Sequence, residues 1–308
     1  LWSTYVGDAG HAFLRDMDVD SQGRVYLAAV NVGQSMTPFI ANGWQTSLSG
    51  DGNDGAYIRL SADASHSEYG TYFGASNSSS TSTGSASVRL TPDGSVVVSS
   101  VESGQNFPTV RAYQASNAGG NDFILMKFSP SDLIDFATYL GGSGNESNET
   151  HHLAIDNAGK IYLTGATASS NFPTTAGVVQ RQFGGATDTL VSVLSADGQS
   201  LLASTLLGGN GIELTQGINV AHVGNTADAV VLSGTTTSSS TSLRASTGAT
   251  SGSGGGEDAY LAVLSADLTT LRYLRRMGGS GDDNGRANEI SSDGWEIYFG
   301  GHTYNSTI

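Results

Sequence analysis

The sequence contains no cysteine and few charged residues, and each of these features limits the classes of protein to which the chain can belong. With 0 Cys, disulfide scaffolds, thiol catalysis and cysteine-ligated metals are all excluded. Charged residues make up 13% of the chain, about half the usual share, so solubility must come from Ser, Thr, Asn and Gly. No apolar run approaches the roughly 20 residues that cross a bilayer, so we expect no transmembrane segment.

Basic residues are especially scarce. Lys and Arg number 13 against 28 Asp and Glu, which gives a formal net charge of -15. Nucleic acids and anionic membrane surfaces both require a basic face, so we predict neither as a partner. The chain begins at Leu1 rather than Met, which we interpret as the result of signal-peptide removal. Together with the composition, this predicts an extracellular or cell-surface location.

A short sequence motif, called the repeated phrase below, recurs at a fixed spacing along the chain. It reads Thr-Tyr-Val-Gly, Thr-Tyr-Phe-Gly, Thr-Tyr-Leu-Gly-Gly and Thr-Leu-Leu-Gly-Gly, with its threonines at 4, 71, 138 and 205, a period of 67. A fifth, decayed copy begins at Arg275. The approximate units are 4–70, 71–137, 138–204, 205–274, and 275–308 with 1–6. Such a long unbroken period is typical of a repeat architecture.

Each unit reads as four strands joined by turns. In the third unit we expect strands over 152–156, 161–165, 187–194 and 201–207, because β-branched and aromatic runs are separated there by Asn, Asp and Gly. No segment keeps a helical period for ten residues. Four-stranded units repeated around a centre form a β-propeller. We therefore predict a single all-β domain over residues 1–308, with five blades and a ring closed by the N-terminal strand joining the last blade.

The repeat resembles the bacterial SBBP-type β-propeller repeat. The third unit carries nearly all of its pattern: the phrase from Thr138 to Gly144, the loop Asn171–Thr175, then Gln180, Gly184-Gly185 and Asp188. The resemblance implies a propeller and an extracellular setting, since such repeats occur in secreted or surface proteins. It implies no reaction, because the shared residues are turn glycines and strand apolar residues.

Besides Asp16-Met17-Asp18-Val19-Asp20, where the repeat places a strand end, two acidic stretches are candidate calcium sites. Gly278 to Asp283 matches the first six positions of a glycine-rich calcium nonapeptide, with Asp282 and Asp283 as oxygen ligands. A second stretch contains Asp51 and Asp54. The nonapeptide pattern occurs once rather than in tandem, so we favour an interblade corner for it. We predict no catalytic residue, no cofactor and no metal, and keep calcium at these residues as the alternative.

The two ends of the repeat pattern predict an incomplete last blade. Residues 1–6 read as a fourth strand with no preceding blade, and 295–299 as a second strand with no third or fourth. Unpaired backbone groups invite strand addition. We therefore predict self-association through the last blade, and the expected interaction residues are Leu1, Trp2, Thr4, Val6, Trp295, Tyr298, Phe299 and Tyr304.

These observations predict a non-catalytic building block of an extracellular assembly, with a filament subunit as one form. No nucleophile elbow, phosphate-binding loop or metalloprotease motif is present, so no enzyme is predicted. One alternative is a carbohydrate-binding, adhesin-like module with surface glycans as partners. The aromatic residues that could stack on sugars are Trp2, Trp44, Trp295, Tyr113 and Phe172, and we expect the Trp44 ring, in a long loop, to be exposed. The other is a polysaccharide-active enzyme.

Overall fold

The computed structural model describes residues 2–7, 12–33, 36, 39–49, 54–76, 85–223, 226–239, 243, 256–291, 294 and 296–304. This part of the chain contains strands and no helix, and hence no helix that could cross a membrane. The strands are β1 (Phe13–Val19), β2 (Val25–Val32), β3 (Asp54–Leu60), β4 (Ser67–Phe73), β5 (Ser87–Leu90), β6 (Val96–Glu102), β7 (Asp122–Phe128), β8 (Ile134–Leu140), β9 (Glu146–Ser147), β10 (Leu153–Ile155), β11 (Ile161–Thr167), β12 (Asp188–Leu194), β13 (Leu201–Leu207), β14 (Glu213–Val223), β15 (Thr226–Thr236), β16 (Asp258–Ser265), β17 (Leu271–Met277), β18 (Asp283–Ile290) and β19 (Ile297–Thr303).

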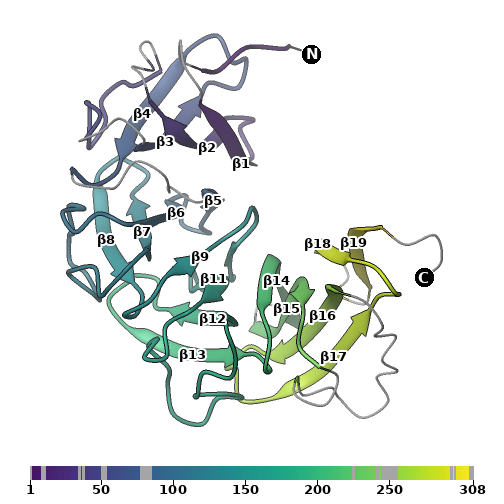
Figure 1. Ribbon diagram of the computed structural model, residues 1–308. Coiled ribbons are helices and arrows are strands. Elements are labelled where there is room, and N and C mark those ends of the chain that lie inside the picture. The colour runs from purple at the N-terminus through teal and green to yellow at the C-terminus, as the bar shows by residue number, and fades with distance from the viewer. Residues whose placement is uncertain are drawn as a thin grey trace. The chain divides into compact units, whose positions relative to one another are not determined.

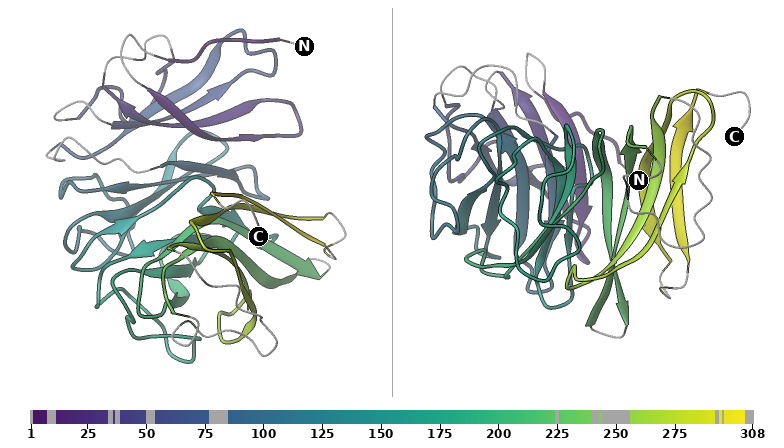
Figure 2. Two further views of the ribbon diagram at one scale, coloured as in Figure 1. Left: turned by 45° about the vertical axis from the view of Figure 1, so that its right-hand side comes forward. Right: turned by 60° about the horizontal axis from the view of Figure 1, so that its bottom comes forward.

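The strands form antiparallel sheets in sequence order, grouped in two compact units (Figures 1 and 2). The first unit, Leu1–Gly141 with Asp197–Gln199, holds the sheets β1-β2-β3-β4 and β5-β6-β7-β8. The second unit, Gly142–Ala196 with Ser200–Ile308, holds β10-β11-β12-β13 with β9 paired to β11, then β14-β15-β16-β17, then β18-β19. The predicted all-β class and the four-stranded antiparallel sheets are confirmed.

The hairpin turns explain several of the repeated glycines. Gly159 follows β10 and has a φ of 78°, and Gly198 follows β12 with a φ of 68°. L-residues with a side chain rarely adopt this left-handed conformation, so glycine is the residue that lets each hairpin turn tightly. Both φ values are those that a tight hairpin turn requires.

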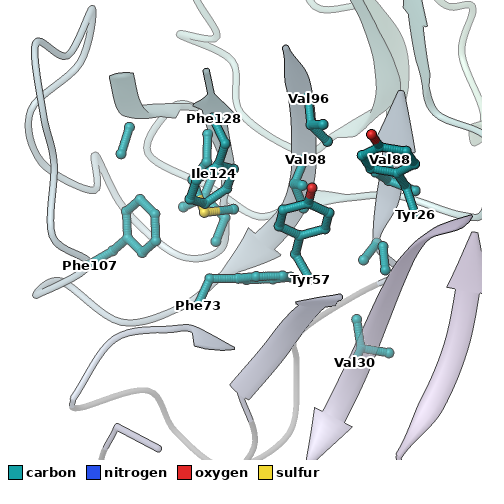
Figure 3. Packing of buried hydrophobic residues seen from close by; sticks show 14 of the residues in the cluster. Tyr26, Val30, Tyr57, Phe73, Val88, Val96, Val98, Phe107, Ile124 and Phe128 are labelled. Atoms are coloured by element: carbon teal, nitrogen blue, oxygen red, sulfur yellow. The ribbon is translucent and has the colours of Figure 1, made fainter. Parts of the chain in front are cut away.

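An aromatic core fills the space between the two sheets of the first unit (Figure 3). The Tyr57 ring lies 6.5 Å from Tyr26 and 5.3 Å from Phe128, measured between ring centroids. Each ring comes from a strand whose alternate residues point at the neighbouring sheet, so facing sheets bury one another. Phe107 belongs to the same core although it lies in a loop.

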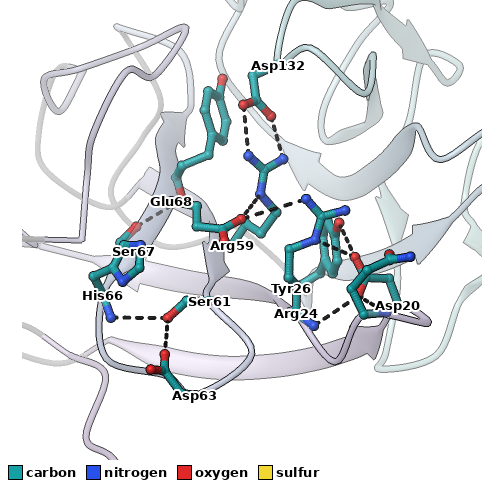
Figure 4. Close-up of polar contacts among 12 residues, drawn as sticks. Asp20, Arg24, Tyr26, Arg59, Ser61, Asp63, His66, Ser67, Glu68 and Asp132 are labelled. Atoms are coloured by element: carbon teal, nitrogen blue, oxygen red, sulfur yellow. Dashed lines mark hydrogen bonds and ion pairs between the residues drawn. The ribbon is translucent and has the colours of Figure 1, made fainter.

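Charged contacts also join the two sheets of the first unit, β1–β4 and β5–β8. In β1, Asp16 accepts a bond from the Arg89 guanidinium of β5 at 2.6 Å. Farther out, the Arg59 guanidinium of β3 binds both carboxylate oxygens of Asp132 at 2.7 and 2.9 Å (Figure 4). A bidentate pair of this kind fixes orientation as well as distance.

The second unit has its own apolar core between β10–β13 and β14–β17. Tyr162, Val191, Leu232 and Tyr260 are buried there. The Tyr260 hydroxyl satisfies its polar end by bonding with the Thr189 hydroxyl at 2.8 Å.

The structure differs from the expected strands at both ends of the chain. Residues 2–7 form no strand, because the segment lies against the first sheet: the Trp2 indole donates to the Ala62 carbonyl at 3.0 Å, and Val6 packs on the apolar cluster of that sheet. The last strand, expected over 295–299, runs from Ile297 to Thr303. Its register is set by pairing with β18, from Ile290↔Ile297 to Asp283↔Thr303.

Truncation of Phe107 tests the anchoring of the long loops. Phe107 is buried, and its ring lies 5.6 Å from that of Tyr139, so Phe107→Ala should lower the free energy of unfolding by about 3–5 kcal/mol. Urea denaturation measures this change. Tyr113→Ala is the control, since Tyr113 is in the same loop and exposed. Equal stability of the two variants would contradict the anchoring role.

Candidate functional site

A glutamine clasp closes each of the first three sheets at the end of its fourth strand. In the third sheet, the Gln180 backbone N–H donates to the Thr205 hydroxyl at 2.9 Å, and the Gln180 side-chain oxygen accepts the Gly208 N–H at 3.2 Å. The Gln180 side-chain amide then donates to Asp188 at 3.0 Å. The threonine and glycine of the repeated phrase thus tie the loop before the third strand to the end of the fourth.

The first two sheets repeat this clasp. Thr71 and Thr138 receive the backbone N–H of Gln45 and Gln114, each at 2.9 Å. The Gln114 amide donates to Asp122 at 2.8 Å, as in the third sheet. In the first sheet the Gln45 amide donates instead to the Gly74 carbonyl at 3.3 Å. The 67-residue period of the sequence therefore corresponds to the repetition of this glutamine clasp.

A buried aspartate begins the third strand of every four-stranded sheet. These residues are Asp54, Asp122, Asp188 and Asp258. Asp188 also accepts the Gly184 N–H at 2.9 Å. A Cβ at Gly208 would lie 2.2 Å from the Asp188 carboxylate carbon, so only glycine leaves room for the acid.

A second buried acid follows the glycine pair at a constant distance in the second unit. Glu146, Glu213 and Asp283 accept the N–H of Gly142, Gly209 and Gly279 at 3.0, 2.7 and 2.7 Å. Each acid stands four residues after its glycine. Charge-assisted bonds to backbone N–H groups hold the corner between consecutive sheets.

The fourth sheet replaces the clasp with an ion pair. The Arg276 guanidinium of β17 bonds to Asp258, and both side chains are almost fully buried. Arginine supplies the donor to the corner aspartate that glutamine supplies in the second and third sheets. The charge of this aspartate is therefore neutralised directly.

Burial shapes the electrostatics of these corners. Loss of hydration raises the pKa of Asp188 to about 6, helped by the nearby negative charge of Glu213, while the Gly184 N–H acts in the opposite direction. Burial also raises the pKa of Asp54 and of Glu102 above their ordinary values. Because these carboxylates are buried, their ionised forms lose hydration and are destabilised relative to the protonated forms.

The candidate calcium residues occupy such corners. Asp54 accepts the Ser49 N–H at 2.7 Å, and Asp282 accepts the Glu257 N–H at 3.1 Å. Asp283 is the second acid described above, and Asp51 lies outside the described residues. Within the described ranges, no three His, Asp or Glu side chains gather as a group that could hold an ion. Calcium binding at these residues stays a prediction.

The last sheet is docked on its neighbour but open at its other edge. The Asn288 side chain of β18 donates to the Ser233 hydroxyl of β15 at 2.9 Å, and the Asn219 amide of β14 donates to the Asn288 carbonyl at 2.6 Å. In the described part of the chain, β19 pairs with β18 alone. The polar groups that face the fourth sheet thus have partners, whereas β19 has no second strand partner among the described residues.

The exposure of β19 sets it apart from the other second strands. β6 and β11 are buried along their whole length, because a third strand and a neighbouring sheet cover them. In β19 only Phe299 is partly buried. Tyr298 is 58% exposed and Tyr304, just past the strand, 77% exposed. Three of the predicted interaction residues therefore lie at or next to this open edge.

The predicted residues of the N-terminal segment lie on the first sheet. Trp2 and Thr4 are exposed, and Val6 is half-buried. Leu1 and Trp295 lie outside the described residues. The Trp44 ring, expected to be exposed, is half-buried and packs edge-on against Phe107 at 5.9 Å, so the expected exposure is wrong. Its stacking on sugars stays a prediction.

Residues 135–173 match the family model of the β-propeller repeat known as SBBP. The chain thus carries a repeat of this family, and the predicted resemblance is confirmed. The matched segment contains the phrase from Thr138 to Gly144 and reaches the Phe-Pro element at Phe172. No curated protein sequence matches the chain.

The contact between the corner aspartate and glycine gives a sharp stability test. Gly208→Ala forces the Asp188 carboxylate to move, so the free energy of unfolding should fall by on the order of 2 kcal/mol or more. Gly300→Ala is the control, because nothing lies within 4 Å of a Cβ there. Calorimetric melting of both variants checks the difference, and an unchanged melting temperature for Gly208→Ala would refute the contact.

Asp188 should also make stability depend on pH. Its pKa is about 6 in the folded protein against the ordinary 3.8, so between these values the folded state binds more protons than the unfolded state. The free energy of unfolding should therefore increase by roughly 1 kcal/mol from this group as the pH falls from 7 to 5. Urea denaturation at several pH values measures it. Asp188→Asn should reduce this slope, and an identical slope would rule the assignment out.

Proposed function

We propose that the chain is a non-catalytic structural building block of an extracellular assembly. In this proposal it forms a five-bladed propeller whose last blade is completed by strand addition. The N-terminal segment takes the outermost position of that blade, and a strand of a second copy takes the position next to β19. Because the donor and acceptor surfaces differ, such a contact joins subunits head to tail and extends into a filament.

The open edge of β19 is the observation that carries the proposal. The strand presents backbone N–H and C=O groups beyond the only sheet partner it has among the described residues, and its side chains are exposed. Uncovered edges are the sites at which other chains add strands. The edge also lacks lysine: its exposed residues include Ile297 and Tyr298, which suit strand pairing.

The N-terminal segment supports the proposal from the other side. Thr4, Tyr5, Val6 and Gly7 repeat the phrase that ends the fourth strand in three of the other units. The segment forms no strand, and Tyr5 is 98% exposed. Its Thr4 hydroxyl is the group that would receive a glutamine backbone N–H in a completed blade.

The first sheet has an uncovered flank as well. On β1, Phe13, Met17 and Val19 are each about half exposed, whereas Asp16 of the same strand faces the second sheet. An apolar strand face of this kind favours packing against a further sheet, as the fifth blade would provide.

The roles of the repeated residues favour a structural protein over an enzyme. The corner acids, glutamines and glycines are all engaged in hydrogen bonds that hold sheets and loops, as the clasps of Gln180 and Gln114 illustrate. The acidic, cysteine-free composition rich in small polar residues supports an extracellular location.

A charge placed on the open edge tests the assembly. We expect the native protein to sediment as concentration-dependent oligomers, and Tyr298→Lys to shift it to monomer, because an edge lysine opposes strand addition. Sedimentation velocity and negative-stain electron microscopy measure the change. Tyr113→Lys, an equal change at a partly exposed loop residue, is the control.

Deletion of residues 2–6 should have the same effect as Tyr298→Lys, since both remove part of the completed blade. If the native protein is monomeric at every concentration, or if neither variant alters its oligomers, the proposal fails.

A further inference from the structure

Each unit contains a polar cavity at the same place in the repeat. The cavity of the second unit has a volume of about 430 Å³, and that of the first unit about 330 Å³. Both lie beside the first hairpin turn of a sheet, where the next sheet of the same unit closes the opposite wall. Volumes of this size fall in the lower part of the range of about 300–1,000 Å³ that is common for small-molecule sites.

The first wall is built from the same three residue types in both cavities. The turn after the first strand reads Asp-x-x-Gly-basic-apolar-Tyr, and supplies Asp156, Lys160 and Tyr162 in the second unit. In the first unit the matching residues are Asp20 and Arg24, with Tyr26 two positions on. The cavities are therefore a product of the repeat rather than accidents of two unrelated loops.

The aspartate of this wall is fixed in place. One oxygen of Asp156 accepts the backbone N–H groups of Ala158 and Lys160 at 2.9 and 2.8 Å, and the other accepts the Tyr162 hydroxyl at 3.3 Å. Figure 4 shows the matching arrangement of Asp20, whose second oxygen receives the Tyr26 hydroxyl at 3.0 Å. These bonds fix the orientation of the carboxylate in the cavity wall before a ligand is present.

The basic residue differs between the two cavities. Arg24 donates to Asp20 at 2.6 Å. Lys160 is exposed and makes no ion pair within the described residues, so its ammonium group can donate into the cavity. Of the two lysines in this acidic chain, one is therefore placed at the rim of the larger cavity.

The second wall of the larger cavity adds charges of both signs. Arg272 is paired with Asp228 at 2.5 and 3.2 Å, and Asp267 lies beside them. With Asp156 and Lys160, the lining holds three carboxylates and two cations. An anion would meet the carboxylates and a cation the basic groups, whereas a hydroxyl group both donates and accepts and so satisfies either kind.

We propose that these repeated cavities bind neutral saccharides. Sugar hydroxyl groups accept hydrogen bonds from Lys160 and Arg272 and donate them to the fixed aspartate in the second unit. In the first unit Asp20 and Arg24 play these parts. The ligand is hydroxyl-rich and uncharged because the lining is polar and of mixed sign.

Saturation-transfer difference NMR tests the proposal on the intact chain. The probes are D-glucose, D-galactose, D-mannose and N-acetyl-D-glucosamine, each at about 10 mM, a concentration that would occupy most of a site whose dissociation constant is about 1 mM. We expect transfer to at least one probe. Lys160→Met should roughly halve the signal, and Lys160→Met combined with Arg24→Met should remove it.

Arg111→Met is the matched control, because the Arg111 side chain is exposed and bonds to the Asp135 carbonyl outside both cavities. It should leave the signal unchanged, and the melting temperatures should show that all variants are folded. Two results would each overturn the proposal: no transfer to any of the four sugars, or transfer that persists in the double variant.

Discussion

The structure depends on the contact between a buried carboxylate and a glycine, because the carboxylate occupies the space that any other side chain would need. In the third sheet Asp188 sits where a Cβ on Gly208 would be, and Gln180 joins the two. Burying the acid is costly, as its raised pKa shows. In exchange, the backbone N–H groups at the end of one strand and the start of the next loop find partners, which a buried corner could not otherwise provide.

A corner in which one carboxylate satisfies several backbone and amide donors suits a chain with few charged residues. Ion pairs on the surface contribute little to stability. Some pairs in this protein instead lie between sheets, where they fix the orientation of one sheet against the next, as Arg59 and Asp132 do. The fourth sheet shows the same logic, since Arg276 does for Asp258 what glutamine does elsewhere. The last sheet keeps the second acid, Asp283, and so remains attached to the fourth even though β19 is uncovered.

Much of the fold could be predicted from the sequence, because strand periodicity and turn glycines are local signals. The strands and the positive φ at Gly159 follow from residues close in sequence. The corner acids were harder to assign, since Asp54 and Asp283 were weighed as calcium ligands although they accept backbone N–H groups. The signal was available in the aspartates at 54, 122, 188 and 258, whose spacing follows the repeat. The state of residues 2–7 and the cavity walls depend on contacts between distant segments, which no local pattern encodes.

Because the clasp of each of the first three sheets is made from residues of that one sheet and its loops, its geometry makes no demand on how many sheets there are. Gln114, Asp122, Thr138 and Gly141 all belong to the second sheet, and their counterparts to the third. Duplicating the gene segment that encodes one sheet would therefore copy a complete clasp together with the strands that it joins. Gain or loss of such a segment would change the number of sheets and leave the geometry of each remaining corner unaltered.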